Sequence, residues 1–365
     1  MNISRNLVIL GAATIAAATT SWTVPASAAD PYYKGKTITV LIGRGPGSGT
    51  DATVRSFTKY WSKYIPGNPK IINKNTKGFA AFNTVYEKGK PDGTLITFTP
   101  YDPVSPMTKR KGFRADYGKM SFVGGFVNPP MLYALTKVIK SNNDIMKMKG
   151  AIYGGQRPTL RFDLMGRITQ DIMGNDYRYT TGFGGGKKVL NAMRRGEVHL
   201  QTVGLNLYRL TAERALVKTG KAIPLWHYDF PQAPMMAKEV FGPEIPSFEA
   251  HYTKIHGKKP SGEMWDIYKW MAKTVNGLSY SAWMPPGGKK EAYEALLASF
   301  EKTAKDPAYL AEQKKMFGFN LPVVDRATGL DVVKAMTDAT PAQVSFLNKY
   351  IKEGAKHKIK KKKKK

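Results

Sequence analysis

The stretch "TVLIGRGPGSGTD", residues 39–51, changes within a few positions from β-branched apolar residues to glycine, proline and hydroxyl residues, and it ends in an acid. A buried strand that ends at Ile42, a glycine-rich loop and a helix that begins near Asp51 explain this change. In open sheets with parallel strands, ligands bind beyond the carboxyl ends of the strands, where helix N-termini direct backbone N–H groups into a crevice. The loop between Ile42 and Asp51 is therefore the first candidate binding segment.

The sequence around this loop alternates between strands and helices. A strand is expected over 37–42, a helix over 51–64, a second strand over 70–73, a helix over 79–88 and a third strand over 95–99. Three strands that alternate with two helices predict a parallel sheet with right-handed crossover connections.

The alternation resumes after residue 130 and predicts a second α/β unit. The expected elements are strands over 131–135, 151–154, 177–180, 199–203 and 223–226, and helices over 160–173 and 188–195. Prolines interrupt the pattern over 229–276, which is interpreted as an elaboration of the second unit. A strand within 278–288 and helices over 289–305, 307–316 and 341–353 follow.

The first 29 residues have the features of a secretory signal peptide. Arg5 gives a positive start, residues 7–18 are apolar but too short to span a bilayer, and residues 26–28 form a small-x-small cleavage site. The alternative, an N-terminal anchor helix, is weakened by Gly11 and by the threonines of the segment. Cysteine is absent, which excludes disulfides and thiolate chemistry. We therefore expect an exported protein that depends on its hydrophobic core.

The chain is strongly basic, with a formal net charge of +30, and removal of the signal segment lowers this charge to +29. Eight lysines lie within residues 356–365, "KHKIKKKKKK", which are predicted to form a disordered tail because like charges repel and apolar area is lacking. The tail either attracts the protein to an anionic membrane surface or only keeps it soluble. Nucleic acid is not an expected partner, because zinc-finger cysteines, an RNP-like segment and a helix-turn-helix pattern are all missing.

The glycine-rich loops do not match the nucleotide-binding patterns. Gly43, Gly45, Gly47 and Gly49 alternate, whereas the dinucleotide fingerprint requires G-x-G-x-x-G and an acid after the second strand. The Walker phosphate loop requires a lysine followed by a hydroxyl residue, and neither "GSGTD" nor "GFGGGKK" at 182–188 supplies this pair. No nucleotide or other cofactor is therefore expected.

The remaining interpretation is a cradle for a small carboxylate. The N–H groups of the loop, the positive end of the following helix, and the hydroxyls of Ser48 and Thr50 can all donate to an anion. Two further loops, "YGGQRPT" at 153–159 and "TTGFGGGKK" at 180–188, open helices of the second unit. Donor-rich loops on two units predict that the units close on a bound anion from opposite sides. The alternative is that these glycines only make tight strand-to-helix turns.

The sequence offers no pattern of an enzyme. The segment Gly45–Gly49 resembles G-x-S-x-G only with the serine displaced by one position, so it does not form a nucleophile elbow. The five histidines include no H-E-x-x-H pair: His199, His227, His251, His256 and His357. A hydrolase would need residues that the sequence does not supply.

Four segments in order resemble the substrate-binding proteins of tripartite tricarboxylate transporters, the TctC/Bug receptor family. They are "PGSGTD" after the first strand, "PDGTL" before the third, "TTGFGGGKKVLNAMRRGEVHLQTVG" in the second unit and, more loosely, "SYSAWMPPGG" near 280–288. The family patterns are P-G-G-x-x-D, P-D-G-Y-T-L, a glycine-rich "PYKGGGPALTDLLGGQVD"-like segment and W-x-G-L-x-x-P-x-G. The resemblance covers about residues 31–351, and the order of the motifs is a stronger signal than any one of them.

The resemblance implies a two-lobed, type II periplasmic binding fold, in which each lobe is a mixed, mostly parallel sheet flanked by helices. Such a receptor closes on an organic acid through backbone groups, helix N-termini and water, and delivers it to a membrane transporter. Lobe 1 is then expected over 30–129 and 279–355, and lobe 2 over 130–278. An exported basic protein that binds polyanions is the alternative function.

The resemblance and the loop pattern together give a set of candidate ligand-binding residues. These are Arg44, Gly45, Pro46, Gly47, Ser48, Gly49, Thr50, Asp51 and Tyr101 in lobe 1, and Gly154, Gly155, Gln156, Phe183, Gly184, Gly185 and Gly186 in lobe 2.

The chain also departs from the family pattern. "KGFAA" replaces a glycine-rich segment after the second strand, and residues 254–277 have the character of an insertion. Arg44 stands where the family usually has an aromatic residue, and it either makes a bidentate carboxylate contact or faces solvent.

Overall fold

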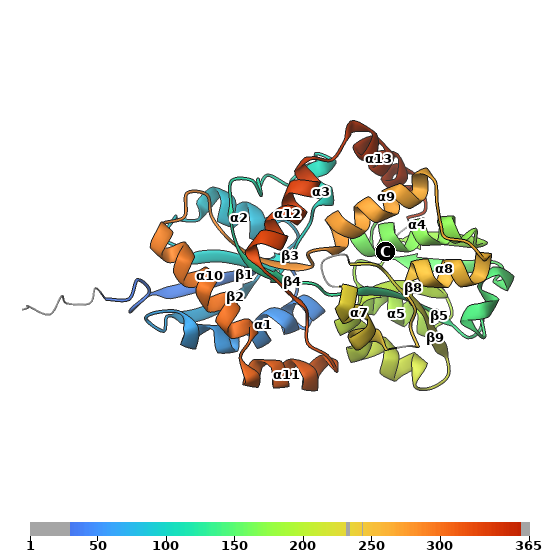
Figure 1. Ribbon diagram of the computed structural model, residues 1–365, viewed down its shortest axis with the longest axis horizontal. Coiled ribbons are helices and arrows are strands. Elements are labelled where there is room, and N and C mark those ends of the chain that lie inside the picture. The colour runs from blue at the N-terminus through green and yellow to red at the C-terminus, as the bar shows by residue number, and fades with distance from the viewer. Residues whose placement is uncertain (1–29, 231–233, 243, 359–365) are drawn as a thin grey trace, which may run out of the picture. The chain divides into compact units, whose positions relative to one another are not determined.

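The computed structural model describes residues 30–230, 234–242 and 244–358. Within these ranges the chain forms two mixed β-sheets, each flanked by helices (Figure 1). The predicted signal peptide, residues 1–29, and the part of the lysine-rich tail from residue 359 onward lie outside the described residues. Residues 356–358, also expected to be disordered, are ordered, and the Thr181 N–H donates to the backbone oxygen of His357 at 3.1 Å. No helix in the described ranges is both long enough and apolar enough to cross a membrane.

The first sheet has the strand order β11-β4-β10-β3-β1-β2. Its strands are β1 (Thr37–Ile42), β2 (Lys70–Asn75), β3 (Leu95–Pro100), β4 (Ser121–Phe126), β10 (Tyr280–Met284) and β11 (Val323–Val324). β1 pairs in parallel with β2 and β3, as the alternating pattern predicted. β10 runs antiparallel between β3 and β4. The late strand β10 therefore returns the chain to the first sheet.

Helices from both ends of the chain cover this sheet. They are α1 (Gly49–Trp61), α2 (Ala80–Lys88), α3 (Val104–Met107), α10 (Lys290–Ala304), α11 (Pro307–Phe317) and α12 (Arg326–Thr337), with the 3₁₀ turn η1 (Ser62–Tyr64). Phe57 of α1 packs its ring against Phe98 of β3 and, with centroids 4.5 Å apart, against Phe300 of α10. Aromatic burial therefore joins the N-terminal and C-terminal segments of this lobe.

The second sheet has the order β7-β6-β8-β5-β9. Its strands are β5 (Pro130–Leu135), β6 (Ala151–Gly155), β7 (Tyr177–Thr181), β8 (Leu200–Gly204) and β9 (Ala222–His227). The helices between residues 142 and 276 are the 3₁₀ helix η2 (Asn142–Lys147), α4 (Arg161–Met173), α5 (Gly186–Arg194), α6 (Leu205–Leu207), the π-helix η3 (Tyr208–Val217), α7 (Pro234–Phe241), α8 (Phe248–His256), α9 (Glu263–Met271) and the π-helix η4 (Ala272–Asn276).

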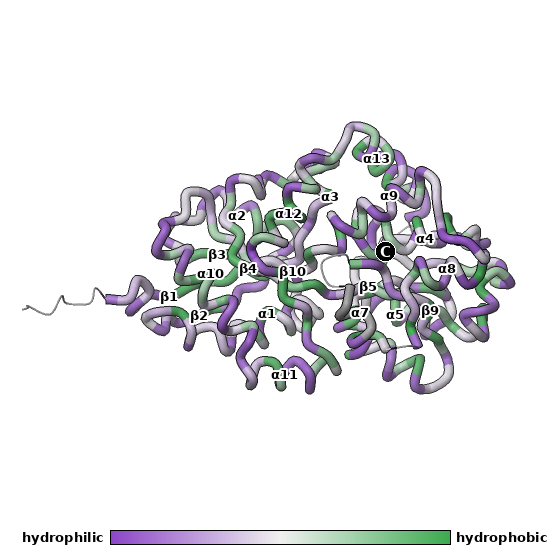
Figure 2. Tube along the Cα trace, viewed as in Figure 1, coloured by the Kyte–Doolittle hydropathy of each residue, from purple (hydrophilic) through white to green (hydrophobic). Residues whose placement is uncertain are grey.

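Strand β5 shows why both faces of the second sheet need cover. Met131 and Tyr133 are buried in one hydrophobic cluster, and Leu132 and Ala134 are buried in another. Alternate residues of a strand point to opposite faces, so a run that is apolar at every position requires helices on both sides. Figure 2 shows the same concentration of hydrophobic residues along β4 and β10.

In the described ranges the chain crosses between the two sheets three times, at 127–129, 277–279 and 338–340. The third crossing differs from the expected lobe boundaries. Helix α13 (Pro341–Ala355) was expected with lobe 1, but Leu347 is buried in the cluster of the second sheet, and α13 contacts β7. Arg167 of α4 also donates to the backbone oxygen of Tyr350 at 3.0 Å. The apolar residues of α13 are therefore buried against lobe 2.

Some elements were absent from the sequence-based assignment. Strand β4 and helix α12 were not expected, and the proline-interrupted segment forms α7, α8 and α9. Residues 254–277, expected as an insertion, form the end of α8, α9 and η4. Tyr268 of α9 is fully buried and donates to the carboxylate of Asp229 at 2.8 Å, so this segment is part of the lobe 2 core.

Candidate functional site

A cavity of about 610 Å³ is lined by segments of both lobes. Lobe 1 contributes residues from the loop after β1, from the loop before α2, and from the segment that follows β3. Lobe 2 contributes the loop after β6, the loop before α5, and the end of β8. Asn128, Ser279 and Tyr280, which lie at or beside two of the crossings, also line it. The cavity is therefore placed where movement of one lobe against the other would change it.

Three helices of nine or more residues begin at this cavity. Gly49, Arg161 and Gly186 are the first residues of α1, α4 and α5, and all three are lining residues. The first N–H groups of a helix have no partner within the helix, and the helix dipole places positive charge there. An anion in the cavity is therefore stabilised from both lobes.

The loop after β1 packs tightly against other residues at Gly43 and is open to the surroundings at Gly45. A β-carbon on Gly43 would lie 2.6 Å from Thr99 Oγ1, and the Gly43 N–H donates to the same oxygen at 2.8 Å. A β-carbon on Gly45 would meet no heavy atom within 4 Å. Gly47 has φ +68°, a conformation that strongly favours glycine. Glycine is thus needed for close packing at 43 and for the turn at 47.

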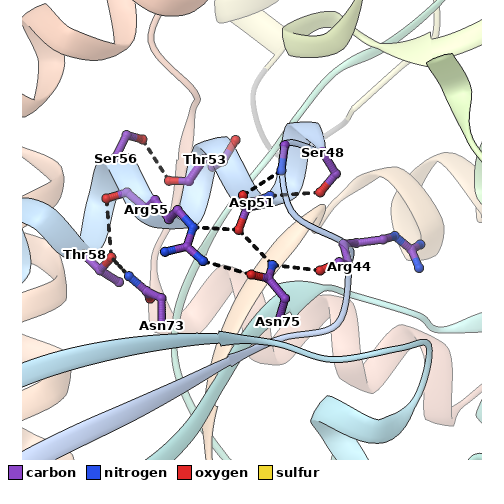
Figure 3. Close-up of polar contacts among 10 residues, drawn as sticks. Arg44, Ser48, Asp51, Thr53, Arg55, Ser56, Thr58, Asn73 and Asn75 are labelled. Atoms are coloured by element: carbon purple, nitrogen blue, oxygen red, sulfur yellow. Dashed lines mark hydrogen bonds and ion pairs between the residues drawn. The ribbon is translucent and has the colours of Figure 1, made fainter.

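Asp51 holds this loop in place (Figure 3). Its carboxylate accepts from the N–H of Gly47, from Nδ2 of Asn75 and from Nε of Arg55, each at 2.8 Å. Asn75 Nδ2 also donates to the backbone oxygen of Arg44 at 2.9 Å. Burial raises the pKa of Asp51, but the hydrogen bonds outweigh it and the net pKa is lowered. Asp51 is not a lining residue, and its carboxylate is used within the loop.

Ser48 has a similar structural role, since its Oγ accepts from the backbone N–H of Asp51 at 3.2 Å and caps α1. In Figure 3 the side chain of Arg44 points away from this network. Arg44 is half-buried and lines the cavity. Burial and the nearby charge of Arg157 lower the pKa of Arg44 to about 10, so that the guanidinium stays charged at neutral pH.

The corresponding loop of lobe 2 is held by Asp163. Its carboxylate accepts from the backbone N–H groups of Gln156 and Arg157 at 3.1 and 3.0 Å. A β-carbon on Gly155 would lie 2.2 Å from Asp163 Oδ2, so that only glycine allows this approach. Burial raises the pKa of Asp163 to about 7, although these hydrogen bonds and those from Tyr179 and Thr181 lower it.

The charged residues that line the cavity are four arginines, the lysines Lys187 and Lys188, and one carboxylate. Arg44 and Arg110 come from lobe 1, and Arg157 and Arg161 from lobe 2. Burial lowers the pKa of Arg161 to about 10 and also lowers that of Arg110. Asp102 is the acidic residue among the described lining residues, and its two oxygens accept from the N–H and the hydroxyl of Ser105 at 3.1 and 2.9 Å.

The structure brings most of the predicted site residues together. The cavity is lined by Arg44, Gly45, Pro46, Gly47, Ser48, Gly49, Thr50, Tyr101, Gln156, Gly184, Gly185 and Gly186. Asp51, Gly154, Gly155 and Phe183 are not lining residues. The two glycines lie within β6 where side chains of other residues pack closely, and Phe183 packs against the hydrophobic core.

Sequence reasoning missed several lining side chains. Arg157 lies in the loop 153–159, which the sequence indicates as a candidate binding segment, and Arg161 is the first residue of α4, the helix that follows. Arg110 gave no signal, because it lies in an irregular segment after α3. Asn128 and Asn206 belong to neither a motif nor a charge cluster, and only the fold places them at the cavity.

Asn128, Asn206 and Tyr280 form a buried polar network between the crossings. Asn128 Nδ2 donates to Asn206 Oδ1 at 2.8 Å and to the Tyr280 hydroxyl at 3.0 Å. Arg161 donates to Ser279 Oγ at 2.8 Å and to the backbone oxygen of Asn128 at 3.3 Å. A cavity-lining arginine of lobe 2 is thus bonded directly to both crossing segments.

The described lining residues include no histidine. No group of three or more His, Asp or Glu side chains in the described ranges is arranged to hold a metal ion. A second cavity of similar volume lies beside α4 and β7 and carries both charge signs, from Arg167 and Arg178 and from Asp171 and Glu197. The first cavity, with its excess of positive charge, is the stronger candidate for an anion site.

Comparison with known proteins gives matches in structure but not in sequence. No model of a protein family matches the chain, and no curated protein matches its sequence. The periplasmic binding protein BugD is similar in structure, with a TM-score of 0.58 at 16% identity over 90% of this chain and 100% of that one.

Two proteins from Rhodopseudomonas palustris are also similar. MatC with bound malate gives a TM-score of 0.56 at 14% identity over 88% of this chain and 98% of its own. A second protein, with adipate, gives 0.59 at 14% identity over 87% of this chain and 97% of its own. At such identities the likeness concerns the fold. The prediction of two helix-flanked mixed sheets is confirmed, and the chain has the fold of the periplasmic solute-binding proteins. The expectation that the sheets are mostly parallel is wrong, because β10 and β5 each run antiparallel to both of their neighbours.

Proposed function

We propose that the chain is an extracytoplasmic solute receptor, a divergent member of the TctC/Bug family, that captures a small organic carboxylate between its two lobes. The observation that carries this proposal is the cavity at which the N-termini of α1, α4 and α5 and four arginines meet. Backbone N–H groups and guanidinium groups are the donors that suit a carboxylate.

The mechanism is closure without chemistry. A ligand that contacts the loop after β1 and the start of α5 links the two lobes, and it favours the closed form by its higher affinity for that form. The membrane component of a tripartite tricarboxylate-type transporter then recognises the closed receptor. The malate and adipate named for two proteins of the same fold support a carboxylate ligand.

A periplasmic location fits this role. The predicted signal peptide of residues 1–29 supports export, and BugD, which shares the fold, is a periplasmic binding protein. We further propose that the lysine-rich residues 356–365 attract the protein to an anionic lipid surface.

The test is a ligand panel on the protein that starts at residue 30. Thermal unfolding is measured with di- and tricarboxylates, aromatic acids and acidic amino acids, and with heparin at two salt concentrations. A ligand at a hundred times its Kd adds about 2.7 kcal/mol to the unfolding free energy, a clear rise in Tm. A salt-sensitive response to heparin, with none to any small acid, would instead support the polyanion-binding alternative.

A further inference from the structure

The C-terminal end of the described chain is attached to lobe 2 beside the loops that form the cavity. We call the end of lobe 2 at which loops 153–159 and 182–188 line the cavity its cavity end. Thr181, the last residue of β7, donates its N–H to the backbone oxygen of His357 at 3.1 Å and forms a parallel bridge with Lys358. Because the two segments run in the same direction at this bridge, the described chain ends toward the cavity end of lobe 2.

Helix α13 and the turn after it fix this attachment point. The guanidinium of Arg167 lies 4.0 Å from the ring centroid of Tyr350 in α13, a stabilising cation–π contact. A β-carbon on Gly354 would lie 3.3 Å from Cβ of Pro158, so that the backbone of α13 packs closely on the loop 153–159. The end of the chain is therefore held against one loop of the cavity and hydrogen-bonded beside the other.

The cavity end of lobe 2 is basic. Residues 153–159, 180–188 and 354–358 contain five lysines and arginines and no acid, and four of the five are exposed: Arg157, which is half-buried, and Lys187, Lys188, Lys356 and Lys358. Lys356 pairs with Glu353 at 2.8 Å, a neighbouring acid on α13. Positive charge is therefore concentrated where the described chain ends.

The opposite end of lobe 2 has a different charge. Residues 142–150 and 171–176 directly precede β6 and β7, and the Gly150 N–H donates to Asp176 there at 3.3 Å. These two segments contain three acids and two lysines. The excess of positive charge is thus a property of one end of the lobe and not of the whole lobe.

The residues after Lys358 add to this charge. Six lysines and Ile359 make up residues 359–365, so that this segment offers no pattern of apolar side chains for a groove on a protein. An anionic lipid surface, in contrast, attracts each lysine close to it by about 1 kcal/mol. Seven residues span at most about 25 Å when extended, so lysines that contact lipid keep the cavity end near the membrane.

We infer that the cavity end of lobe 2 is the face that lies against an anionic lipid membrane, with the loops 153–159 and 182–188 directed toward the lipid. The inference rests on the proposed attraction of residues 356–365 to lipid and deepens it, because it adds the orientation of the protein. Capture of a carboxylate does not depend on it. A receptor held in this way presents its cavity loops to a transporter in the same membrane.

Vesicle binding by the protein that starts at residue 30 tests the partner. Vesicles that contain phosphatidylglycerol are compared with vesicles of phosphatidylcholine alone, at low and at high salt. We expect salt-sensitive binding to the anionic vesicles only, and at least tenfold weaker binding after deletion of residues 359–365, because six lysines are lost. The vesicles contain no protein, so an acidic protein partner cannot cause this binding. Absence of binding would overturn both the attraction and the inference.

Two double variants test the face with the tail intact. Lys187→Gln with Lys188→Gln removes two exposed lysines from the cavity end, and Lys147→Gln with Lys149→Gln removes two exposed lysines from the opposite end. We expect the first pair to weaken binding to anionic vesicles at least fivefold and the second pair less than twofold, because the attraction falls off within a Debye length of the membrane. Equal losses would show that only net charge matters, which would overturn the orientation and leave the attraction.

A fluorophore on a single cysteine measures the orientation directly, because the chain has no cysteine of its own. Lys188→Cys places it in the first turn of α5 at the cavity end, and Lys149→Cys places it just before β6 at the opposite end. Anionic vesicles that carry a quencher on the lipid head groups should quench the label at 188 at least twice as strongly as the label at 149. Equal quenching, or stronger quenching at 149, would overturn the inference.

Discussion

Gly45 and Gly185 are the lining residues at which a side chain can enter the cavity without strain. A β-carbon at either position meets no heavy atom within 4 Å, and the φ of Gly185 is 172°, an extended conformation open to any residue. Gly47 is less suitable for a test, because its φ of +68° would strain a branched residue.

Gly45→Val and Gly185→Val should each weaken ligand binding at least tenfold, because the new side chain occupies space needed by the ligand. The unfolding free energy should stay within about 0.5 kcal/mol of the parent, as for other substitutions into open space. Titration calorimetry and chemical denaturation measure the two quantities. Gly118→Val, at an exposed glycine away from the cavity, is the control. Undiminished affinity in both cavity variants would reject the site.

His227 should make the fold sensitive to acid. Burial lowers the pKa of His227 to about 4, and the ring stacks on Phe241 with centroids 4.4 Å apart. Between pH 6.5 and 4 the unfolded state binds more protons at this residue than the native state, so stability falls as the pH falls. At pH 4.5 the loss relative to pH 7 is about 2 to 3 kcal/mol.

Two buried carboxyl groups make the protein more stable as the pH falls, which opposes the effect of His227. A variant is therefore needed to isolate the contribution of His227. Burial raises the pKa of Asp163 to about 7 and that of Asp229 to about 6, and both therefore add stability as the pH falls toward 4. Denaturation of the parent and of His227→Gln at pH 7 and 4.5 gives the difference. The loss on acidification should be smaller in the variant, and an equal loss in both proteins would show that His227 does not contribute.

At the scale of elements, the start of α1 depends on Asp51 more than on Arg55. Asp51→Asn removes an acceptor for the Gly47 N–H and for Arg55, and we expect the unfolding free energy to fall by about 1 to 2 kcal/mol and ligand binding to weaken. Arg55→Met removes an ion pair whose arginine side chain is 47% exposed, and should cost less than about 1 kcal/mol. Equal losses in the two variants, measured by denaturation, would contradict this order.

The elements that sequence could predict are those with a local signal. Apolar periodicity placed β1 over 37–42 with its bounds as found, and it located α4 and α10 within one residue at each end. Helix α12 was missed because its sequence offers few large apolar residues, and β4 because two glycines interrupt it. The antiparallel place of β10 depends on the return of the chain, which no local pattern records.

The same distinction applies to the site. The loop after β1 can be recognised from the sequence, because glycines and a capping serine follow a strand directly. The group of four arginines at the cavity cannot, since Arg44 and Arg161 are more than a hundred positions apart in the chain. Their proximity follows from the pairing of each loop with its own sheet and from the three crossings between the sheets.

At the scale of the whole described molecule, hydrogen bonds join the loops of the two lobes at the cavity, among them those from Arg110 to Thr159 and from Asn206 to Gly49. Lys187 at the start of α5 donates to the backbone oxygen of Gly47 at 3.0 Å, which links the second lobe to the loop after β1. The lysine is exposed, and one such hydrogen bond is worth about 0.5 to 1 kcal/mol. Its loss should shift the ratio of open to closed receptor by about two- to fivefold.

Lys187→Met should therefore make the unliganded receptor more open and weaken ligand binding by a similar factor. The chain contains no cysteine, so that spin labels attached through Lys88→Cys on α2 and Lys218→Cys after η3 are unique, and their distance distribution reports the separation of the lobes. Lys188→Met is the matched control, because Lys188 also lines the cavity but makes no side-chain hydrogen bond across the lobes in the described residues. Unchanged distances in Lys187→Met, or the same change in both variants, would show that this bond does not set the closure of the free protein.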